Sequence, residues 1–103
     1  LQTWAGAGVI IGAVVYAARL ADGVIKIGWT EHFDERLDWL GAYNGQRVEL
    51  LAFRLGTRDD EQALHASLVA HRARGREYYH PSTEVVAVVN AMRDDLRLPH
   101  VAA

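Results

Sequence analysis

Three side chains in the first third of the sequence, one phenol and two cations, are of types that together can handle a phosphate group. Tyr16 is followed by Lys26 and then by Arg36 at equal intervals. Two cations neutralise phosphate oxygens, and a phenol beside them can accept a proton if a neighbouring cation lowers its pKa. The same residues also fit a structural role, in which Tyr16 is half-buried and both cations are solvated.

A carboxylate and an imidazole later in the chain suggest a metal ligand. Glu61 and His65 are one helical turn apart, which would place them on the same face of a helix. A lone carboxylate can hold Mg²⁺ when phosphate and water supply the remaining ligands, because Mg²⁺ keeps much of its hydration shell. The ordinary alternative is that Asp59, Asp60 and Glu61 complement the helix dipole, and that the Glu–His pair lies on a helix surface.

A β-hairpin would carry the first two of these side chains. Two runs rich in β-branched residues, 14–16 and 24–27, flank an Asp-Gly turn, which is a strong hairpin signal. Residue parity across the turn does not decide whether Tyr16 and Lys26 share a face, but strand pairing can place them opposite or diagonal to each other. A third strand is predicted over 48–55.

Apolar residues at helical spacing predict three helices. The first follows Thr30 as N-cap and ends at Gly41, the second starts at Gly56-Thr57 and ends before Gly75, and the third opens at Pro81-Ser82-Thr83 and closes at Arg97-Leu98-Pro99. Leu64, Leu68 and Val69 are expected to form the apolar edge of the second helix. Tyr78 and Tyr79 suit a short, partly buried edge strand. The pattern predicts an α+β fold, a small antiparallel sheet covered by helices.

The length of 103 residues fits one modest core. We expect a single domain at 14–98, an N-terminal lead-in at 1–13 that could belong to a larger protein, and a tail at 99–103. The uncharged stretch 4–18 is shorter than the roughly 20 residues that a membrane span needs, so no membrane partner is expected.

The composition limits the kinds of binding site and partner that we expect. No cysteine is present, which excludes disulfides and thiolate metal sites and suits a reducing cytoplasm, the location that we expect. The net charge of −2 gives no overall basic surface for DNA. Contact with DNA would therefore need a local basic patch.

Five short motifs, in this order and at this spacing, resemble the GIY-YIG nuclease superfamily. They are Val14-Val15-Tyr16, Lys26-Ile27-Gly28-Trp29-Thr30, Arg36-Leu37, Glu61 with Leu64-His65, and Gly75-Arg76-Glu77-Tyr78-Tyr79. More narrowly, they resemble the branch named after a phage T5 open reading frame and a fungal meiotically up-regulated gene. The second motif of that branch typically reads Lys-Ile-Gly-x-Thr, and its late helix reads Glu-x-x-Leu-His. The resemblance covers most of the chain, from Val14 to Val89.

The resemblance implies an α+β fold with a three-stranded antiparallel sheet and a one-metal phosphodiesterase site. Tyr16 matches a tyrosine proposed as general base or as a group that positions water, and Arg36 matches an arginine that stabilises the phosphorane. Glu61 matches the carboxylate that holds the metal, Mg²⁺ (or Mn²⁺). Lys26 replaces the second tyrosine of many members, where it could lower the phenol pKa or grip the phosphate. His65 completes the expected catalytic set.

The motifs also depart from the family pattern. Family members often carry a basic residue just after the second glycine, and Trp29 stands at that position here. This difference puts binding of the DNA phosphate backbone in doubt. The first motif reads Val-Val-Tyr, a change in strand packing more than in chemistry. The asparagine that many members carry after the last helix has no clear counterpart.

Two interpretations follow. The first is a metal-dependent DNA endonuclease, a nicking module of phage or mobile-element type, whose sequence preference would come from a partner domain or protein. The second is a catalytically inactive scaffold of the same fold that binds nucleic acid or a protein, which the acidic net charge and Trp29 favour. Cleavage that requires Glu61 and Arg36 would indicate the first, and salt-dependent binding without cleavage would indicate the second.

Overall fold

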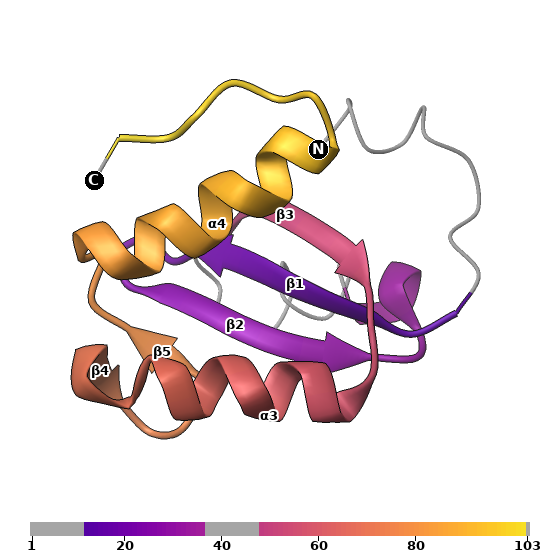
Figure 1. The fold of residues 1–103 in the computed structure, drawn as a ribbon, viewed down its shortest axis with the longest axis horizontal. Helices are drawn as coiled ribbons and strands as arrows, with labels where there is room; N and C mark the ends of the chain where they lie inside the picture. The colour runs from indigo at the N-terminus through magenta and orange to yellow at the C-terminus, as the bar shows by residue number, and fades with distance from the viewer. Residues whose placement is uncertain (1–11, 37–47, 103) are drawn as a thin grey trace.

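The computed structural model describes residues 12–36 and 48–102, which contain five strands and two longer helices (Figure 1). In chain order the elements are β1 (Val14–Arg19), β2 (Ile25–Thr30), β3 (Glu49–Leu55), α3 (Arg58–Ser67), the 3₁₀ turn η1 (Val69–His71), β4 (Arg72–Arg74), β5 (Tyr78–Tyr79) and α4 (Thr83–Asp95). Residues 33–36 are also helical. The predicted lead-in up to residue 11 and the predicted helix beyond residue 36 lie outside the described residues.

The predicted hairpin is confirmed. β1 and β2 pair antiparallel, from Val14 opposite Thr30 to Arg19 opposite Ile25. In the turn, Gly23 adopts a φ of 89°, and the Val24 N–H donates to Asp22 Oδ1 at 3.0 Å. Glycine takes this left-handed backbone without steric cost, and the aspartate side chain satisfies a turn N–H. The Asp-Gly pair therefore sets the register of both strands.

The described residues form a sheet of five strands in the order β3-β1-β2-β5-β4, so the expectation of three strands is wrong. The predicted second helix is also too long, because α3 ends at Ser67 and the chain turns through η1 into β4. Gly75, with φ 56°, turns β4 back into β5, which pairs with β2 through Ile25 opposite Tyr79. This pairing places β5 inside the sheet and leaves β4 at its edge, contrary to the edge position expected for Tyr78 and Tyr79.

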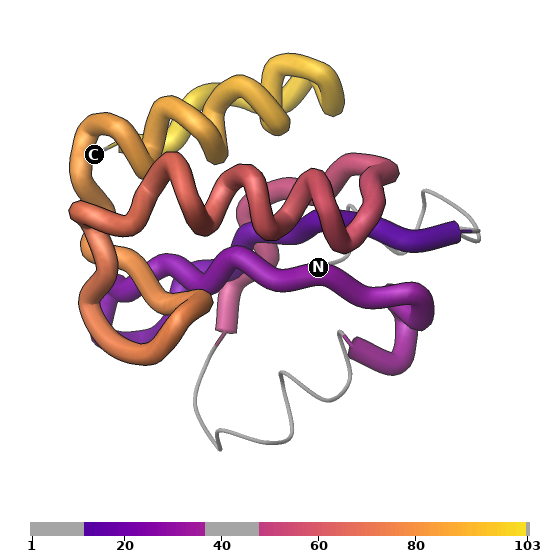
Figure 2. Tube along the Cα trace, turned by 60° about the horizontal axis from the view of Figure 1, so that its bottom comes forward, coloured from indigo at the N-terminus to yellow at the C-terminus, as the bar shows by residue number. Residues whose placement is uncertain are grey.

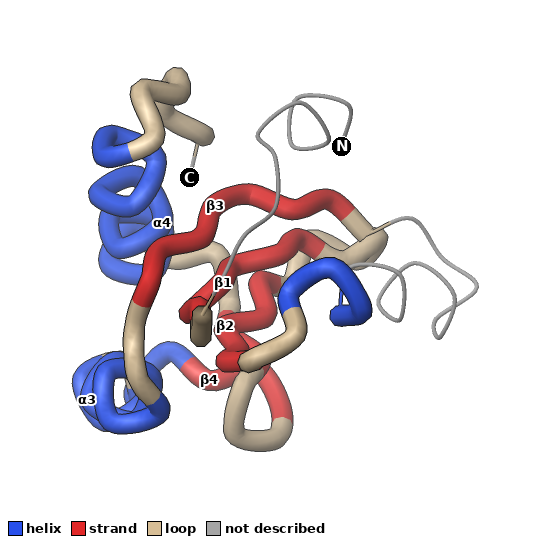
Figure 3. Tube along the Cα trace, turned by 90° about the vertical axis from the view of Figure 1, so that its right-hand side faces the viewer, coloured by secondary structure: helices blue, strands red, loops and turns tan. Residues whose placement is uncertain are grey.

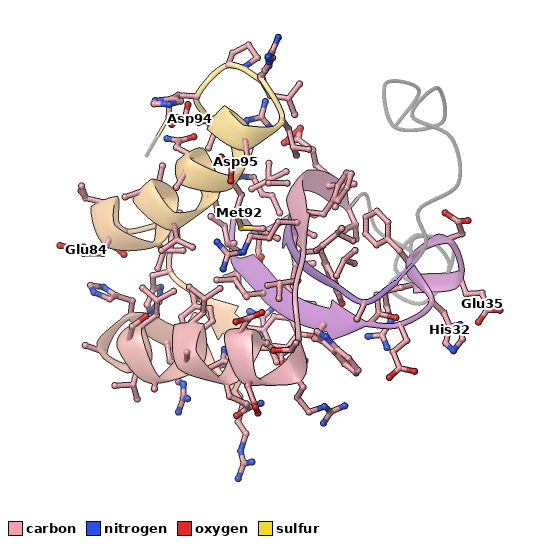
Figure 4. All side chains as sticks on the ribbon, turned by 45° about the vertical axis from the view of Figure 1, so that its right-hand side comes forward. His32, Glu35, Glu84, Met92, Asp94 and Asp95 are labelled. Carbon is pink, nitrogen blue, oxygen red and sulfur yellow. The ribbon has the colours of Figure 1, made fainter. Side chains whose placement is uncertain are left out.

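Helices α3 and α4 both cover one face of the sheet (Figure 2). Alternation along the strands supplies this face with Val15, Ala17, Ile25 and Ile27, which pack with Leu68 of the α3 end and with Val85, Val86, Val89 and Met92 of α4. Met92 points from α4 toward the sheet (Figure 4). Val69, expected in this apolar edge, is instead 54% exposed, because the helix has already ended before it.

The opposite face carries the helical residues 33–36 (Figure 3). A second, smaller core lies there, formed by Val14, Tyr16, Phe33 and Leu50. Thr30 is the last residue of β2 rather than an N-cap, and its hydroxyl accepts the His32 N–H at 3.0 Å. Tyr16 and Arg36 are therefore on the face that α3 and α4 do not cover.

Both long helices begin at side-chain caps. Thr57 accepts the Asp60 N–H, and Asp60 accepts the Thr57 N–H, which completes a capping box for α3. Ser82 caps α4 by accepting the Val85 N–H. Within the described residues, neither helix is long and apolar enough to cross a membrane.

Candidate functional site

A cavity of about 610 Å³ opens at the edge of the sheet where β2 extends beyond β5. β5 pairs with Ile25 and Lys26, and the Ile27 N–H donates to the Glu77 carbonyl at 2.9 Å. Beyond the residues that pair with β5, this edge of β2 has no further strand among the described residues, and β2 also contacts α3. Elements from both faces of the sheet therefore meet at this cavity.

Gly28 allows the Tyr16 phenol to lie flat across β2. The two residues are directly opposite in the β1–β2 register, and a Cβ on Gly28 would lie 2.5 Å from Tyr16 Oη. Arg36 Nη1 donates to the same phenol oxygen at 3.4 Å. Lys26 is two residues from Gly28 along β2, so it is the diagonal neighbour of Tyr16 on the same face. The predicted grouping of one phenol and two cations is present.

Tyr16 is protonated at neutral pH. Burial raises the pKa of Tyr16 to about 12, and the charge and hydrogen bond of Arg36 lower it by less. The side chain has no exposed surface. A neighbouring cation is present as expected, but desolvation outweighs its effect on the pKa, so the phenol acts as an acceptor for Arg36 and holds that guanidinium in place.

Lys26 connects the phenol to the acidic part of the site. It is 3% exposed, and its Nζ lies 5.9 Å from the Tyr16 ring centroid and 5.8 Å from that of Tyr78. Burial lowers the pKa of Lys26, while the charges of Glu77 and Glu61 raise it. An ammonium between two aromatic rings is stabilised by cation–π attraction and by these carboxylates.

Glu61 and His65 lie on the inward face of α3 and are each only 5% exposed. Their Oε2 and Nε2 atoms are 3.6 Å apart. One potential ligand atom from each of Glu61, His65 and Glu77 lies within 4.8 Å of the other two. The predicted same-face pair is thus confirmed, and Glu77, to which sequence reasoning gave no role, joins it.

The second ring nitrogen of His65 fixes how the imidazole is oriented. His65 Nδ1 hydrogen-bonds to the Tyr79 hydroxyl, and the two rings stack with centroids 5.7 Å apart. Burial raises the pKa of Tyr79, so that phenol is neutral. His65 Nε2 is buried and, among the described residues, is the only buried side-chain polar atom without a hydrogen-bond partner.

The cavity carries more positive charge than the predicted Arg36 alone would supply. Four arginines line it, Arg36, Arg58, Arg72 and Arg76. The Arg58 guanidinium lies 4.8 Å from the Trp29 ring centroid, and Trp29 Nε1 donates to the Gly56 carbonyl at 3.1 Å. Trp29 therefore holds a guanidinium from α3 at the cavity.

The structure groups all five predicted site residues around one cavity. Arg36, Glu61 and His65 line it directly. Tyr16 and Lys26 lie behind it, in contact with its lining residues Arg36 and Tyr78.

The residues that sequence reasoning missed are Arg58, Arg72, Arg76, Glu77 and Tyr78. Three of these belong to one of the matched motifs, 75–79, so a signal was present. The position of Arg58 in the first turn of α3, beside three acidic residues, carried no such signal.

Comparisons of the chain with protein-family models, curated proteins and solved structures found no match. The likeness to GIY-YIG nucleases therefore depends on the sequence motifs alone.

Proposed function

We propose that the protein is a divalent-metal-dependent phosphodiesterase that cuts DNA, an endonuclease of GIY-YIG type. The observation that carries the proposal is the pairing, in one cavity, of a buried carboxylate–imidazole cluster with four arginines. Acidic and imidazole groups hold a cation, and guanidiniums hold a phosphate. A cavity with both fits a phosphodiester bound next to a metal ion.

The residues present fit a metal ion at Glu61. Beside this buried carboxylate lies His65 Nε2, a buried polar atom that lacks a hydrogen-bond partner among the described residues. When bound, a divalent ion such as Mg²⁺ or Mn²⁺ would act as a Lewis acid on the phosphate and favour formation of the nucleophile at neutral pH.

Arg36 would stabilise the transition state. Hydrolysis joins a water oxygen to phosphorus and breaks the bond to the 3′-oxygen, and negative charge builds on the non-bridging and leaving oxygens. A guanidinium already held in place stabilises that charge more than it stabilises the ground state. Tyr16 is a positioning residue, because its oxygen accepts from Arg36 and its side chain has no exposed surface. Lys26 adds positive charge behind the phosphate.

A second candidate function has one specific observation in its favour. Tyr16 is fully buried and its pKa is raised, which is opposite to what a general base requires. A scaffold that uses the arginines to bind nucleic acid without cutting it would tolerate this arrangement. The two functions differ in whether bound DNA is hydrolysed.

The test is cleavage of supercoiled plasmid, branched DNA and single-stranded DNA by the purified chain, in Mg²⁺ and in Mn²⁺. We expect nicking with at least one ion and none after addition of EDTA. DNA binding that weakens with salt, without cleavage of any substrate in either ion, would support the scaffold instead. An absence of both binding and cleavage would overturn the two candidates together.

A further inference from the structure

The acidic end of the cavity offers three potential metal ligands, whereas the resemblance to a one-metal nuclease implies a single carboxylate. We infer that Glu61, His65 and Glu77 form a three-ligand site for a divalent transition-metal ion, which binds Zn²⁺ or Mn²⁺ in preference to Mg²⁺. This inference rests on the proposed function and specifies the metal ion that the phosphodiesterase uses. The carboxylate of Glu61 alone would accept Mg²⁺, whereas the imidazole nitrogen changes the preference.

The three ligand atoms already converge. They lie within 4.8 Å of one another, with Glu61 and His65 buried and Glu77 partly exposed. Glu61 and His65 come from consecutive turns of α3, while Glu77 comes from the turn that leads into β5. All three residues line the cavity, so an ion held by them would border its open space. Three protein ligands with one open position are typical of catalytic zinc sites.

The hydrogen bond of His65 to Tyr79 orients the imidazole so that its other nitrogen, Nε2, faces the cluster. The Tyr79 hydroxyl donates a hydrogen bond to the Arg76 carbonyl at 3.2 Å, so its oxygen can accept a hydrogen bond from His65 Nδ1. In the neutral imidazole, a hydrogen on Nδ1 leaves a lone pair on Nε2 for a metal ion. Metal-bound histidines have this arrangement, in which the outer nitrogen donates to a neighbouring group that fixes the ring.

The competing explanation is an ion pair between a protonated His65 and Glu61. Nε2 and Oε2 are 3.6 Å apart and share no hydrogen bond, although both side chains are buried. A buried charged pair without a hydrogen bond would be poorly compensated for its desolvation. An ion shared by Glu61, His65 and Glu77 would compensate all three groups.

The experiment is isothermal titration calorimetry of the EDTA-treated chain with Zn²⁺, Mn²⁺ and Mg²⁺, each alone. We expect one ion per chain, with Zn²⁺ and Mn²⁺ bound at least about tenfold more tightly than Mg²⁺. His65→Gln and Glu77→Gln should each weaken Zn²⁺ binding by more than the 10–100-fold that outer hydrogen-bonding partners contribute. Tyr79→Phe should weaken it by about 10–100-fold, as an outer partner.

The chain supplies a matched control. His71 and Glu84 form another histidine–carboxylate pair, at 3.8 Å, outside the cluster. His71→Gln and Glu84→Gln should leave the affinity for Zn²⁺ unchanged. Circular dichroism checks folding, and Glu77→Gln keeps the test valid if His65→Gln fails to fold, since Glu77 is partly exposed.

The outcomes separate this inference from the proposed function. No stoichiometric binding, equal affinity for Mg²⁺ and Zn²⁺, or wild-type affinity in both His65→Gln and Glu77→Gln would overturn the inference. Mg²⁺-dependent nicking with any of these results would leave the nuclease proposal standing. Tight Zn²⁺ binding that depends on the three residues, in a chain that cuts no DNA, would overturn the nuclease proposal alone.

Discussion

Within the part of the chain that the structure describes, two histidine–glutamate pairs have nearly equal separation and very different surroundings. His65 and Glu61 are 3.6 Å apart, and 7% of each side chain is exposed. His71 and Glu84 are 3.8 Å apart, with 28% and 62% exposed. Glu84 points away from the body of the protein at the start of α4 (Figure 4). Separation alone therefore does not distinguish a candidate site from a surface pair.

The difference lies in what surrounds each pair. The buried pair has Glu77 as a third ligand, a ring nitrogen without a hydrogen-bond partner among the described residues, and a cavity lined by arginines. The exposed pair joins η1 to the first turn of α4, where the glutamate also complements the helix dipole. Burial of a polar atom without a hydrogen bond is costly, so His65 Nε2 supports the proposed metal site, whereas the exposed pair gives no such support.

Among substitutions outside the buried pair, the largest effect should come from Arg36, which lines the same cavity. Arg36→Ala should lower the nicking rate by about 10²–10³-fold, because it removes a preorganised donor to the transition state. Arg74→Ala is the matched control, since Arg74 forms an exposed ion pair with Asp22 at the edge strand. Plasmid nicking under identical conditions measures both. Equal loss in the two variants would mean that cleavage depends on overall charge rather than on the cavity.

The second effect concerns stability at alkaline pH. The fold raises the pKa of Tyr16 from 10.0 to about 12, so it favours the protonated phenol. That contribution is complete below pH 10 and is lost as the pH rises through 12, where the free energy of unfolding should fall by about 2–3 kcal/mol. Urea denaturation between pH 9 and 12 measures it. Tyr16→Phe should reduce this fall. An equally steep fall in Tyr16→Phe would contradict the raised pKa of Tyr16 as its cause.

A smaller effect is the difference between the two histidines in their contribution to the free energy of unfolding. In metal-free buffer, His65→Ala should lower the free energy of unfolding by about 1–3 kcal/mol, because it removes the buried contact with Tyr79. His71→Ala removes only a partly exposed ion pair, so its cost should stay below about 1 kcal/mol. Chemical denaturation gives both values. A larger loss for His71→Ala would invalidate the comparison.

The smallest effect should come from Arg58, which lines the cavity from the first turn of α3. Its guanidinium lies over the Trp29 ring. Arg58→Gln should weaken DNA binding about equally for all sequences and lower the slope of log affinity against log salt by about 1. Fluorescence anisotropy at several salt concentrations measures the slope. An unchanged slope would place Arg58 outside the DNA contact.

Local signals in the sequence were sufficient to predict most of the helices and strands. Asp22-Gly23 predicted the hairpin, and the four-residue spacing of Glu61 and His65 predicted their shared face. Both features depend on residues close in the chain, whose geometry is fixed by the turn or helix that they occupy.

The prediction failed where pairing between distant residues decides the structure. Apolar spacing ends at Leu68, and the arginine-rich segment that follows has good helix propensity but forms β4. Burial of Tyr79 opposite Ile25 provides the reason, and this contact spans more than fifty residues. Glu77 could not be assigned for the same reason, since only the added strand brings it to His65. The pKa of Tyr16 likewise depends on burial that the sequence did not show.

In the proposed function, the buried pair, and not the exposed one, supports hydrolysis of a phosphodiester. The most direct test compares plasmid nicking by wild type, Glu61→Gln and Glu84→Gln, purified identically and assayed in Mg²⁺, Mn²⁺ and Zn²⁺. We predict nicking by wild type and Glu84→Gln at equal rates and none by Glu61→Gln. Nicking by Glu61→Gln at the wild-type rate, or no nicking by any of the three proteins, would contradict the claim.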